Sequence, residues 1–183
     1  MKFERLTQFA ILCLALAIAG LALHAAEPED ELKSAVVLSF LRYTEWPERG
    51  GEGPIIVGVV GRSALLEVFR RNLENKPVGN RPIRVVDLNA AADPHCCNVL
   101  YVAAAKPAEI RKALLLPGAV RALTVGESDH FLECGGAVNL LVIDGHMSFE
   151  ANLEAIDRAL IVISSKLLRF GQIRSLNKGG PPA

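Results

Sequence analysis

The stretch Phe131–Phe170 decides the fold and reads FLECGGAVNLLVIDGHMSFEANLEAIDRALIVISSKLLRF. Within it, the run Ala137–Ile143 is aliphatic and β-branched with one polar residue, which is typical of a strand buried on both faces. Asp144–Gly145 can supply the two positive φ angles of a type I′ turn. The alternating segment His146–Glu150 is therefore predicted to return as a strand with one solvent-exposed face, at or near a sheet edge.

Two helical segments are predicted after this hairpin. Asn152 is placed to cap a helix that begins at Leu153, because its side-chain oxygen can accept hydrogen bonds from free backbone N–H groups. A last short helix is predicted over Lys166–Ile173, after a cap at Ser164 or Ser165. The residues expected to face the core are Leu153, Ile156 and Leu160 in the first helix and Leu167, Leu168 and Phe170 in the second.

The chain before this stretch alternates predicted helices and strands. A first helix is expected over Glu29–Thr44 and ends before Pro47. Its apolar stripe is expected to comprise Leu32, Val36, Phe40 and Tyr43. Strands are predicted at Ile55–Val60, Arg81–Leu88, Val99–Ala103 and Ala122–Val125, with helices capped by Ser63 and started by Pro107. This order predicts a single α/β domain with a mainly parallel sheet, helices on both faces, and a C-terminal β-hairpin and helix.

The N-terminus has the pattern of a secretory signal peptide. Lys2 and Arg5 precede the apolar run Phe9–Leu23, which is short for a membrane span. Small residues follow, and cleavage is predicted after Ala25 or Ala26. The expected organisation is a signal peptide at 1–26, an α/β domain at 29–175 and a disordered Gly-Pro-rich tail at 176–183.

Composition and histidine placement argue against several classes of function. Lys plus Arg and Asp plus Glu each number 20, so the chain lacks the basic footprint of a nucleic-acid-binding protein. His95, His130 and His146 are the histidines left after signal cleavage, and none lies in a nucleophile motif. The Cys and His spacings fit no metal site. We therefore expect no enzyme activity, no cofactor and no metal.

Three cysteines remain after cleavage, and an oxidising compartment would allow a disulfide. Cys97 and Cys134 are the preferred pair. Cys96 is an alternative partner for Cys134, since a bridge between adjacent cysteines is sterically poor. Buried thiols without a bond are a further alternative.

Several residues are candidates for contacts with a partner or ligand. Trp46 either packs at a hinge or serves as an amphipathic anchor. Arg62 and Ser63 open a helix whose free N–H groups form an elementary anion site. Lys166 either binds phosphate or decorates an exposed helix face. The candidate binding residues are Trp46, Arg62, Ser63, Glu150, Asn152 and Lys166.

The order of several short segments resembles the YfiR family. These segments are FLRYTEWP at Phe40–Pro47, VGVVG at Val57–Gly61, CNVLYV at Cys97–Val102, LTVGESD at Leu123–Asp129 and, after FE-x-N, ISSKLL at Ile163–Leu168. Two positions depart from the family. Gly58 stands where members often carry a cysteine that bridges to the position of Cys97, and Leu160 stands where a glycine is common.

The resemblance implies a periplasmic, dimeric inhibitor. Such proteins hold an inner-membrane diguanylate cyclase inactive through its periplasmic sensor domain, and an outer-membrane lipoprotein can sequester them. The alternative function is a periplasmic receptor that presents a small ligand to a transporter or sensor kinase. A small hydrolase, with Cys97 and His95 as its candidate residues, is the third hypothesis.

Overall fold

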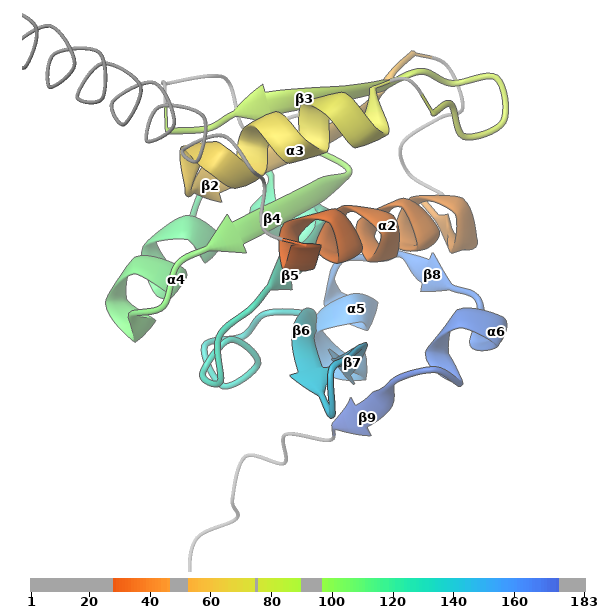
Figure 1. Cartoon of the computed structure of the whole chain (residues 1–183). Helices are drawn as coiled ribbons and strands as arrows, with labels where there is room; N and C mark the ends of the chain where they lie inside the picture. Colours follow the sequence, from red (N-terminus) through yellow and green to blue (C-terminus); the bar gives the residue numbers. More distant parts are fainter. Residues whose placement is uncertain (1–27, 47–52, 75, 90–96, 175–183) are drawn as a thin grey trace, which may run out of the picture.

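A seven-stranded mixed sheet forms the centre of the computed structural model, which describes residues 28–46, 53–74, 76–89 and 97–174 (Figure 1). Its strands are β2 (Ile55–Gly61), β3 (Ile83–Asp87), β4 (Val99–Ala103), β5 (Leu123–Gly126), β6 (Val138–Ile143), β7 (His146–Asn152) and β9 (Gln172–Arg174). The strand order is β3-β2-β4-β5-β6-β7-β9. The strands from β3 to β6 run parallel, β7 is antiparallel to β6, and β9 is parallel to β7.

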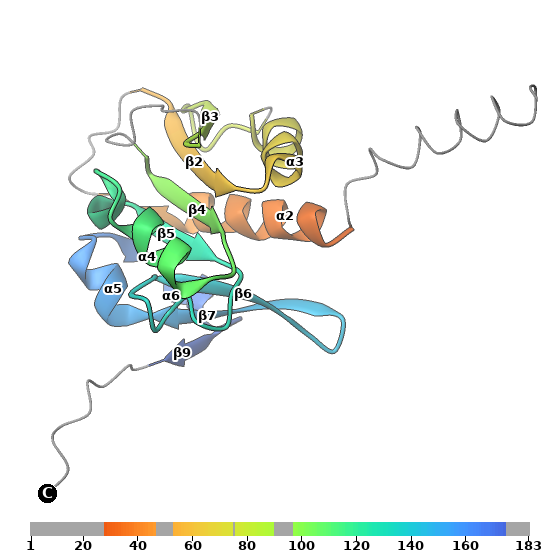
Figure 2. The ribbon, with the colours of Figure 1, turned by 90° about the vertical axis from the view of Figure 1, so that its left-hand side faces the viewer.

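Helices cover both faces of this sheet. They are α2 (Pro28–Tyr43), α3 (Ser63–Leu73), α4 (Pro107–Leu114), the short 3₁₀ helix η3 (Ala119–Arg121), α5 (Leu153–Arg158) and α6 (Ser165–Leu168). One hydrophobic core joins the sheet to α2 and α3, and a second core lies under α4 and η3. Figure 2 shows α3 and α4 on opposite sides of the sheet. The predicted fold class is confirmed.

The buried face of α2 differs from the predicted stripe. Phe40 is fully buried as expected, but Leu32 and Tyr43 are about half exposed, and Val36 is only partly buried. The residues that α2 buries are Asp30, Lys33, Ser34, Val37, Leu38, Phe40 and Leu41. The prediction was wrong because it assigned the polar positions to solvent, whereas the structure buries three of them.

A second, two-stranded sheet follows α2 and was not expected. Thr44 leaves the helix and starts β1 (Thr44–Glu45), which pairs antiparallel with β8 (Val162–Ile163). The backbone N–H of Ser164 extends this pairing by donating to the Tyr43 carbonyl oxygen at 2.8 Å. The N-terminal helix is thereby tied to the C-terminal segment.

The predicted hairpin is present, with one correction. Asp144 and Gly145 have φ angles of 50° and 76°, as a type I′ turn requires. However, Val142 and Ile143 are exposed, so β6 is buried only in its first half. The reason is visible in Figure 2, where the tip of the hairpin extends beyond the neighbouring strands.

The N-cap of α5 is as predicted, but fewer of its apolar side chains are buried than expected. The Asn152 Oδ1 accepts a hydrogen bond from the Ala155 N–H at 3.3 Å. Ile156 is buried, whereas Leu153 and Leu160 are exposed. The prediction placed Leu160 in the helix, but α5 ends at Arg158 and Leu160 has a φ of +54°.

The last helix is shorter than predicted. The Ser164 Oγ accepts a hydrogen bond from the Lys166 N–H, and α6 ends at Leu168. Leu167 is buried, but Phe170 is exposed. Ile173 lies in β9 rather than in a helix. The residues predicted to form the final helical turn instead form β9, which pairs with β7 at the edge of the sheet.

Candidate functional site

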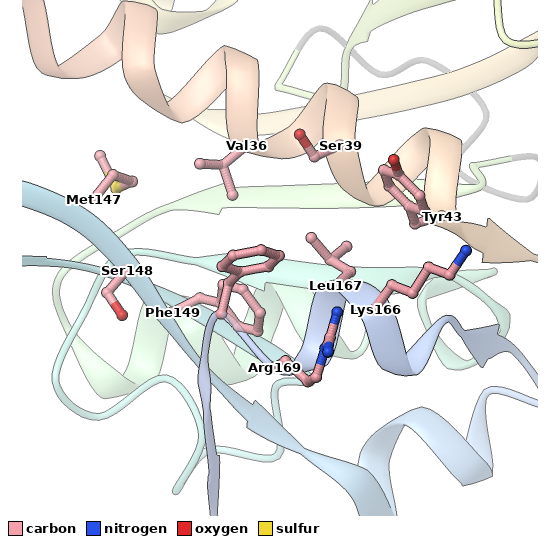
Figure 3. A pocket seen from close by; sticks show the side chains of 10 residues that line it. Val36, Ser39, Tyr43, Met147, Ser148, Phe149, Lys166, Leu167 and Arg169 are labelled. Carbon is pink, nitrogen blue, oxygen red and sulfur yellow. The ribbon is translucent and has the colours of Figure 1, made fainter.

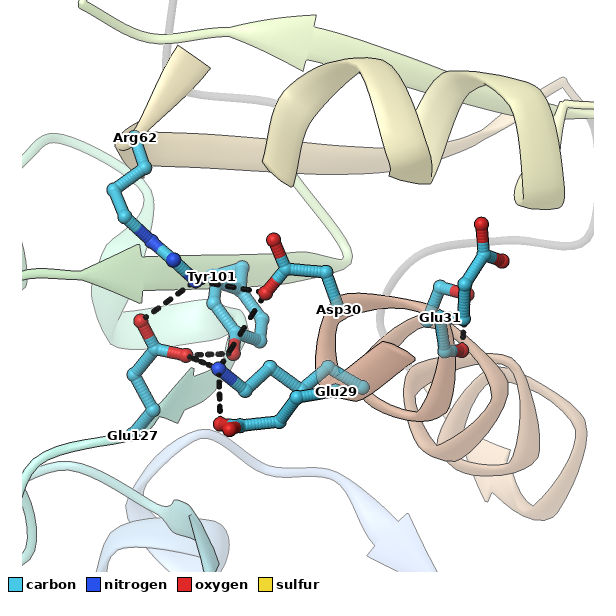
Figure 4. A network of polar contacts seen from close by, with 8 residues as sticks. Glu29, Asp30, Glu31, Arg62, Tyr101 and Glu127 are labelled. Atoms are coloured by element: carbon cyan, nitrogen blue, oxygen red, sulfur yellow. Dashed lines mark hydrogen bonds and ion pairs between the residues drawn. The ribbon is translucent and has the colours of Figure 1, made fainter. Parts of the chain in front are cut away.

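A cluster of charged side chains lies where β2, β4 and β5 end and α2 begins (Figure 4). We call these residues the charged cluster: Glu29, Asp30, Lys33, Arg62 and Glu127. The Lys33 Nζ lies 2.7 Å from Glu29 Oε1 and 3.5 Å from Asp30 Oδ1. It also contacts Glu127 Oε2 at 2.5 Å. Arg62 contacts Asp30 Oδ1 at 2.8 Å and Glu127 Oε1 at 3.4 Å.

The electrostatics of the cluster keep its cations charged. Burial would lower the pKa of Lys33, which is only 5% exposed, but hydrogen bonds to Glu127 and Glu29 outweigh burial and raise it. Burial and the charge of Glu127 raise the pKa of Tyr101 well above 10, and its hydroxyl donates to Glu127 Oε2 at 3.1 Å. Three carboxylates thus face two cations and a neutral phenol. This arrangement fastens α2 to the sheet and leaves neither cation unpaired for an incoming anion.

The predicted helix start at Gly61–Ser63 sits beside this cluster. Gly61 has a φ of +114°, and a Cβ there would lie 2.4 Å from the Ala103 carbonyl oxygen, so only glycine fits. The N-cap position is Arg62, so Ser63 is the first residue of α3 and the prediction that it caps the helix was wrong. Arg62 turns toward the carboxylates of the cluster instead.

A second candidate site is a pocket of about 330 Å³ between α2, β7 and the segment of α6 (Figure 3). We call it the α2–α6 pocket. Its lining residues are Val36, Ser39, Tyr43, Met147, Ser148, Phe149, Lys166, Leu167, Arg169 and Phe170. The wall around Phe149 is rigid because the ring makes an edge contact with Phe40 at a centroid distance of 5.0 Å. A Cβ on Gly171 would lie 2.1 Å from the same ring, so the absence of a side chain at Gly171 allows the backbone to pack directly against Phe149.

The structure separates most of the predicted binding residues. Lys166 lines the α2–α6 pocket. Glu150 is bonded to Arg174 of β9, with its Oε1 2.6 Å from the guanidinium, and is largely shielded. Asn152 is buried as the α5 cap. Trp46 packs against the core, and its Nε1 is buried without a hydrogen-bond partner among the described residues. Arg62 and Ser63 adjoin at the start of α3, and Glu150 and Asn152 lie on the same strand β7, but the six residues do not form one site.

The cysteines lie near the core under α4. Cys97 is buried, and Cys134 is a free thiol whose Sγ lies 3.8 Å from the Pro107 carbonyl oxygen. Cys96 and His95 lie outside the described residues. The Cys97–Cys134 bridge remains a prediction for the oxidised protein.

Within 28–46, 53–74, 76–89 and 97–174, no group of His, Cys, Asp and Glu side chains has an arrangement that could hold a metal ion. Among the same residues, no helix has the length and apolar character needed to cross a membrane.

Sequence reasoning missed both the charged cluster and most of the α2–α6 pocket. A signal for the cluster exists: Asp30 and Lys33 are three apart on a helix, and Glu127 directly follows a parallel strand that ends at the same sheet edge as β2. The pocket left no such signal, because it joins residues from α2, β7 and the C-terminal segment. Their proximity depends on the unexpected β1–β8 and β7–β9 pairings.

Comparison with known protein families identifies a relationship for most of the chain. A protein-family model described as YfiR/HmsC-like matches residues 30–172. The matched range begins in α2 and ends at the first residue of β9, so it contains the whole α2–α6 pocket. A search of curated proteins finds no match.

Proposed function

The chain belongs to the YfiR/HmsC-like family, and from this membership we propose that it inhibits an inner-membrane diguanylate cyclase from the periplasm. The observation that carries the proposal is the family match over residues 30–172. Proteins of this family are periplasmic regulators rather than enzymes. Inhibition would lower cyclic-di-GMP synthesis and restrain biofilm formation through protein contacts alone.

The proposed partner is the periplasmic sensor domain of the cyclase. An outer-membrane lipoprotein that sequesters the inhibitor is a further proposed partner, and the inhibitor is proposed to be a homodimer. Exposed apolar side chains on several elements support binding to other proteins, since such side chains anchor interfaces. They include Val142 and Ile143 on the hairpin, Val162 on β8 and Phe170 after α6. Export by a signal peptide at 1–26 would bring the chain to the compartment of the sensor domain.

The proposal is tested in cells that carry the membrane diguanylate cyclase encoded beside this protein. Cyclic-di-GMP is measured without the protein, with the full chain, and with a variant that lacks residues 1–26. The proposal predicts a fall in cyclic-di-GMP with the full chain only, because the truncated variant stays on the wrong side of the membrane. Immunoblots verify that both forms accumulate to equal amounts.

Two outcomes would contradict the proposal. An unchanged cyclic-di-GMP level with the exported protein would show that this cyclase is not its target. An equal fall with both forms would place the inhibition outside the periplasm. An unchanged level with both forms would favour the second candidate function, a periplasmic receptor for a small ligand, which the α2–α6 pocket supports.

A further inference from the structure

The α2–α6 pocket combines an apolar floor with a polar rim. Val36, Met147, Phe149, Leu167 and Phe170 supply aliphatic and aromatic surface from three different elements. Phe149 and Leu167 are buried, so the floor is held in place by the core. A volume of about 330 Å³ is within the range of pockets for small organic molecules. The apolar surface would bind the hydrocarbon part of such a molecule.

The charge of the rim has one sign. Lys166 and Arg169 both line the pocket, and no carboxylate does. Neither side chain forms an ion pair with a residue in the described ranges, in contrast to Lys33 and Arg62 of the charged cluster. Two cations without a counter-charge, beside an apolar cavity, favour an anionic group at the rim.

Hydroxyl groups complete the polar part of the rim. Ser39, Tyr43 and Ser148 line the pocket together with the two cations. The Ser39 hydroxyl already donates to the Ala35 carbonyl oxygen at 3.0 Å. Figure 3 shows Lys166 extending from α6 toward Tyr43 of α2, so the polar rim spans two elements, with both cations on the α6 side and hydroxyl groups on α2. A carboxylate placed there could accept hydrogen bonds from both sides of the pocket.

We propose that the α2–α6 pocket binds a small amphipathic carboxylate. The hydrocarbon part lies against Phe149 and Leu167, and the carboxylate lies at the rim between Lys166 and Arg169. This inference does not depend on the protein partner proposed above. Because the ligand would contact α2, β7 and the C-terminal segment at once, its binding would also restrain these elements relative to one another.

The test uses the exported protein purified from the periplasm and titrated with octanoate in a calorimeter. Acetate lacks the hydrocarbon chain, and octylammonium reverses the charge. We expect octanoate to bind with a dissociation constant of about 1 mM or lower, and acetate and octylammonium to bind at least about tenfold more weakly. Lys166→Gln/Arg169→Gln should weaken octanoate binding by at least about tenfold, since it removes both charge-assisted hydrogen bonds.

A matched control distinguishes the loss of the two pocket cations from a general change in the net charge of the protein. Arg84→Gln/Lys112→Gln removes the same two charges from exposed positions on β3 and α4, and octanoate affinity should stay unchanged. Val36→Phe keeps both rim cations but fills part of the cavity, so it should weaken octanoate binding. Thermal melting of each variant verifies that it is folded.

Three results would overturn the proposal. They are the absence of octanoate binding to the folded wild-type protein, equal binding of octanoate and octylammonium, and wild-type octanoate affinity in folded Lys166→Gln/Arg169→Gln. These outcomes concern purified protein and leave the cellular cyclic-di-GMP test unaffected. Failure of one proposal is therefore distinguishable from failure of the other.

Discussion

Leu160 adopts a backbone conformation that a leucine rarely occupies. Its φ is +54°, and its side chain is 49% exposed, so little packing offsets the strain. We predict that Leu160→Gly is more stable to unfolding than Leu160→Ala by about 1 kcal/mol, the reverse of the usual order, because only glycine tolerates positive φ without a Cβ penalty. Urea unfolding of dilute protein, followed by circular dichroism, measures the difference.

Leu115 offers the matched control for this prediction. It is 83% exposed and is the C-cap residue that follows α4, with a φ of −89°, so its backbone conformation suits any residue. At this position the alanine variant should be the more stable of the two, because glycine loses more conformational freedom on folding. A Leu160→Ala protein that is as stable as Leu160→Gly would show that the positive φ carries no cost.

Gly58, the other position that departs from the family pattern, also has a local structural explanation. A Cβ on Gly58 would lie 2.6 Å from the Cys97 Sγ and 2.6 Å from the Leu88 Cδ1. The position therefore faces Cys97 directly, which agrees with the bridge that the resemblance implies for family members with a cysteine there. In this chain Leu88 occupies the space next to Gly58. The sequence revealed both departures, but only the backbone explains them.

At the scale of elements, long patterns were predictable and short ones were not. The apolar run of β2 and the Asp144–Gly145 turn predicted their elements correctly because each is decided by local chemistry. The strands β1, β8 and β9 contain only two or three residues and exist through pairing with distant segments. Their sequences carry no periodicity long enough to detect.

The orientation of α2 was misjudged for a different reason. Helical periodicity assigns Asp30 and Lys33 to solvent, yet both are buried because they compensate each other together with Arg62 and Glu127. Such compensation comes from β2 and β5 and is invisible in the helix alone. Consequently the charged cluster, and the exposure of Tyr43 at the pocket, could not be predicted from the pattern.

The charged cluster predicts how stability depends on pH. The pKa of Tyr101 lies well above 10 in the folded protein and near 10 in the unfolded chain. The folded state therefore retains a proton that the unfolded state loses, and stability falls as pH rises above about 10. The raised pKa of Lys33 acts in the same direction. The stability that protonated Lys33 adds is fully present below about pH 10.5, the pKa of an unfolded lysine, and is lost as pH rises through the pKa of Lys33 in the folded protein.

Tyr101→Phe isolates one part of this dependence. We expect the free energy of unfolding of the wild type to fall more steeply between about pH 10 and pH 11, by up to about 1.4 kcal/mol per pH unit for the tyrosine proton. The variant lacks that proton and should show a smaller slope. Urea unfolding at each pH gives both slopes, and equal slopes would mean that Tyr101 does not titrate differently in the two states.

At the scale of the whole molecule, the β1–β8 sheet joins the N-terminal helix to the C-terminal segment and presents apolar surface outward. Val162 of β8 is 56% exposed, and Leu160 is exposed two residues before it. Exposed apolar side chains that lie close together are suited to an interface between copies, because their burial there removes apolar surface from water. We infer that the proposed homodimer uses this surface.

Val162→Lys tests this inference, because it should disrupt the dimer interface and leave the fold of each copy intact. Val162 pairs directly with Glu45 across the β1–β8 sheet, so a lysine there faces a carboxylate on the same side of the sheet. The variant should fold as stably as the wild type and sediment as a monomer at concentrations where the wild type is dimeric, because burying an ammonium group at an interface is costly.

Val120→Lys is the control for this experiment. It places the same charge at an exposed position on η3 and should leave the dimer intact. A Val162→Lys protein that remains dimeric in sedimentation equilibrium would move the interface elsewhere, and a monomeric wild type would exclude the homodimer itself.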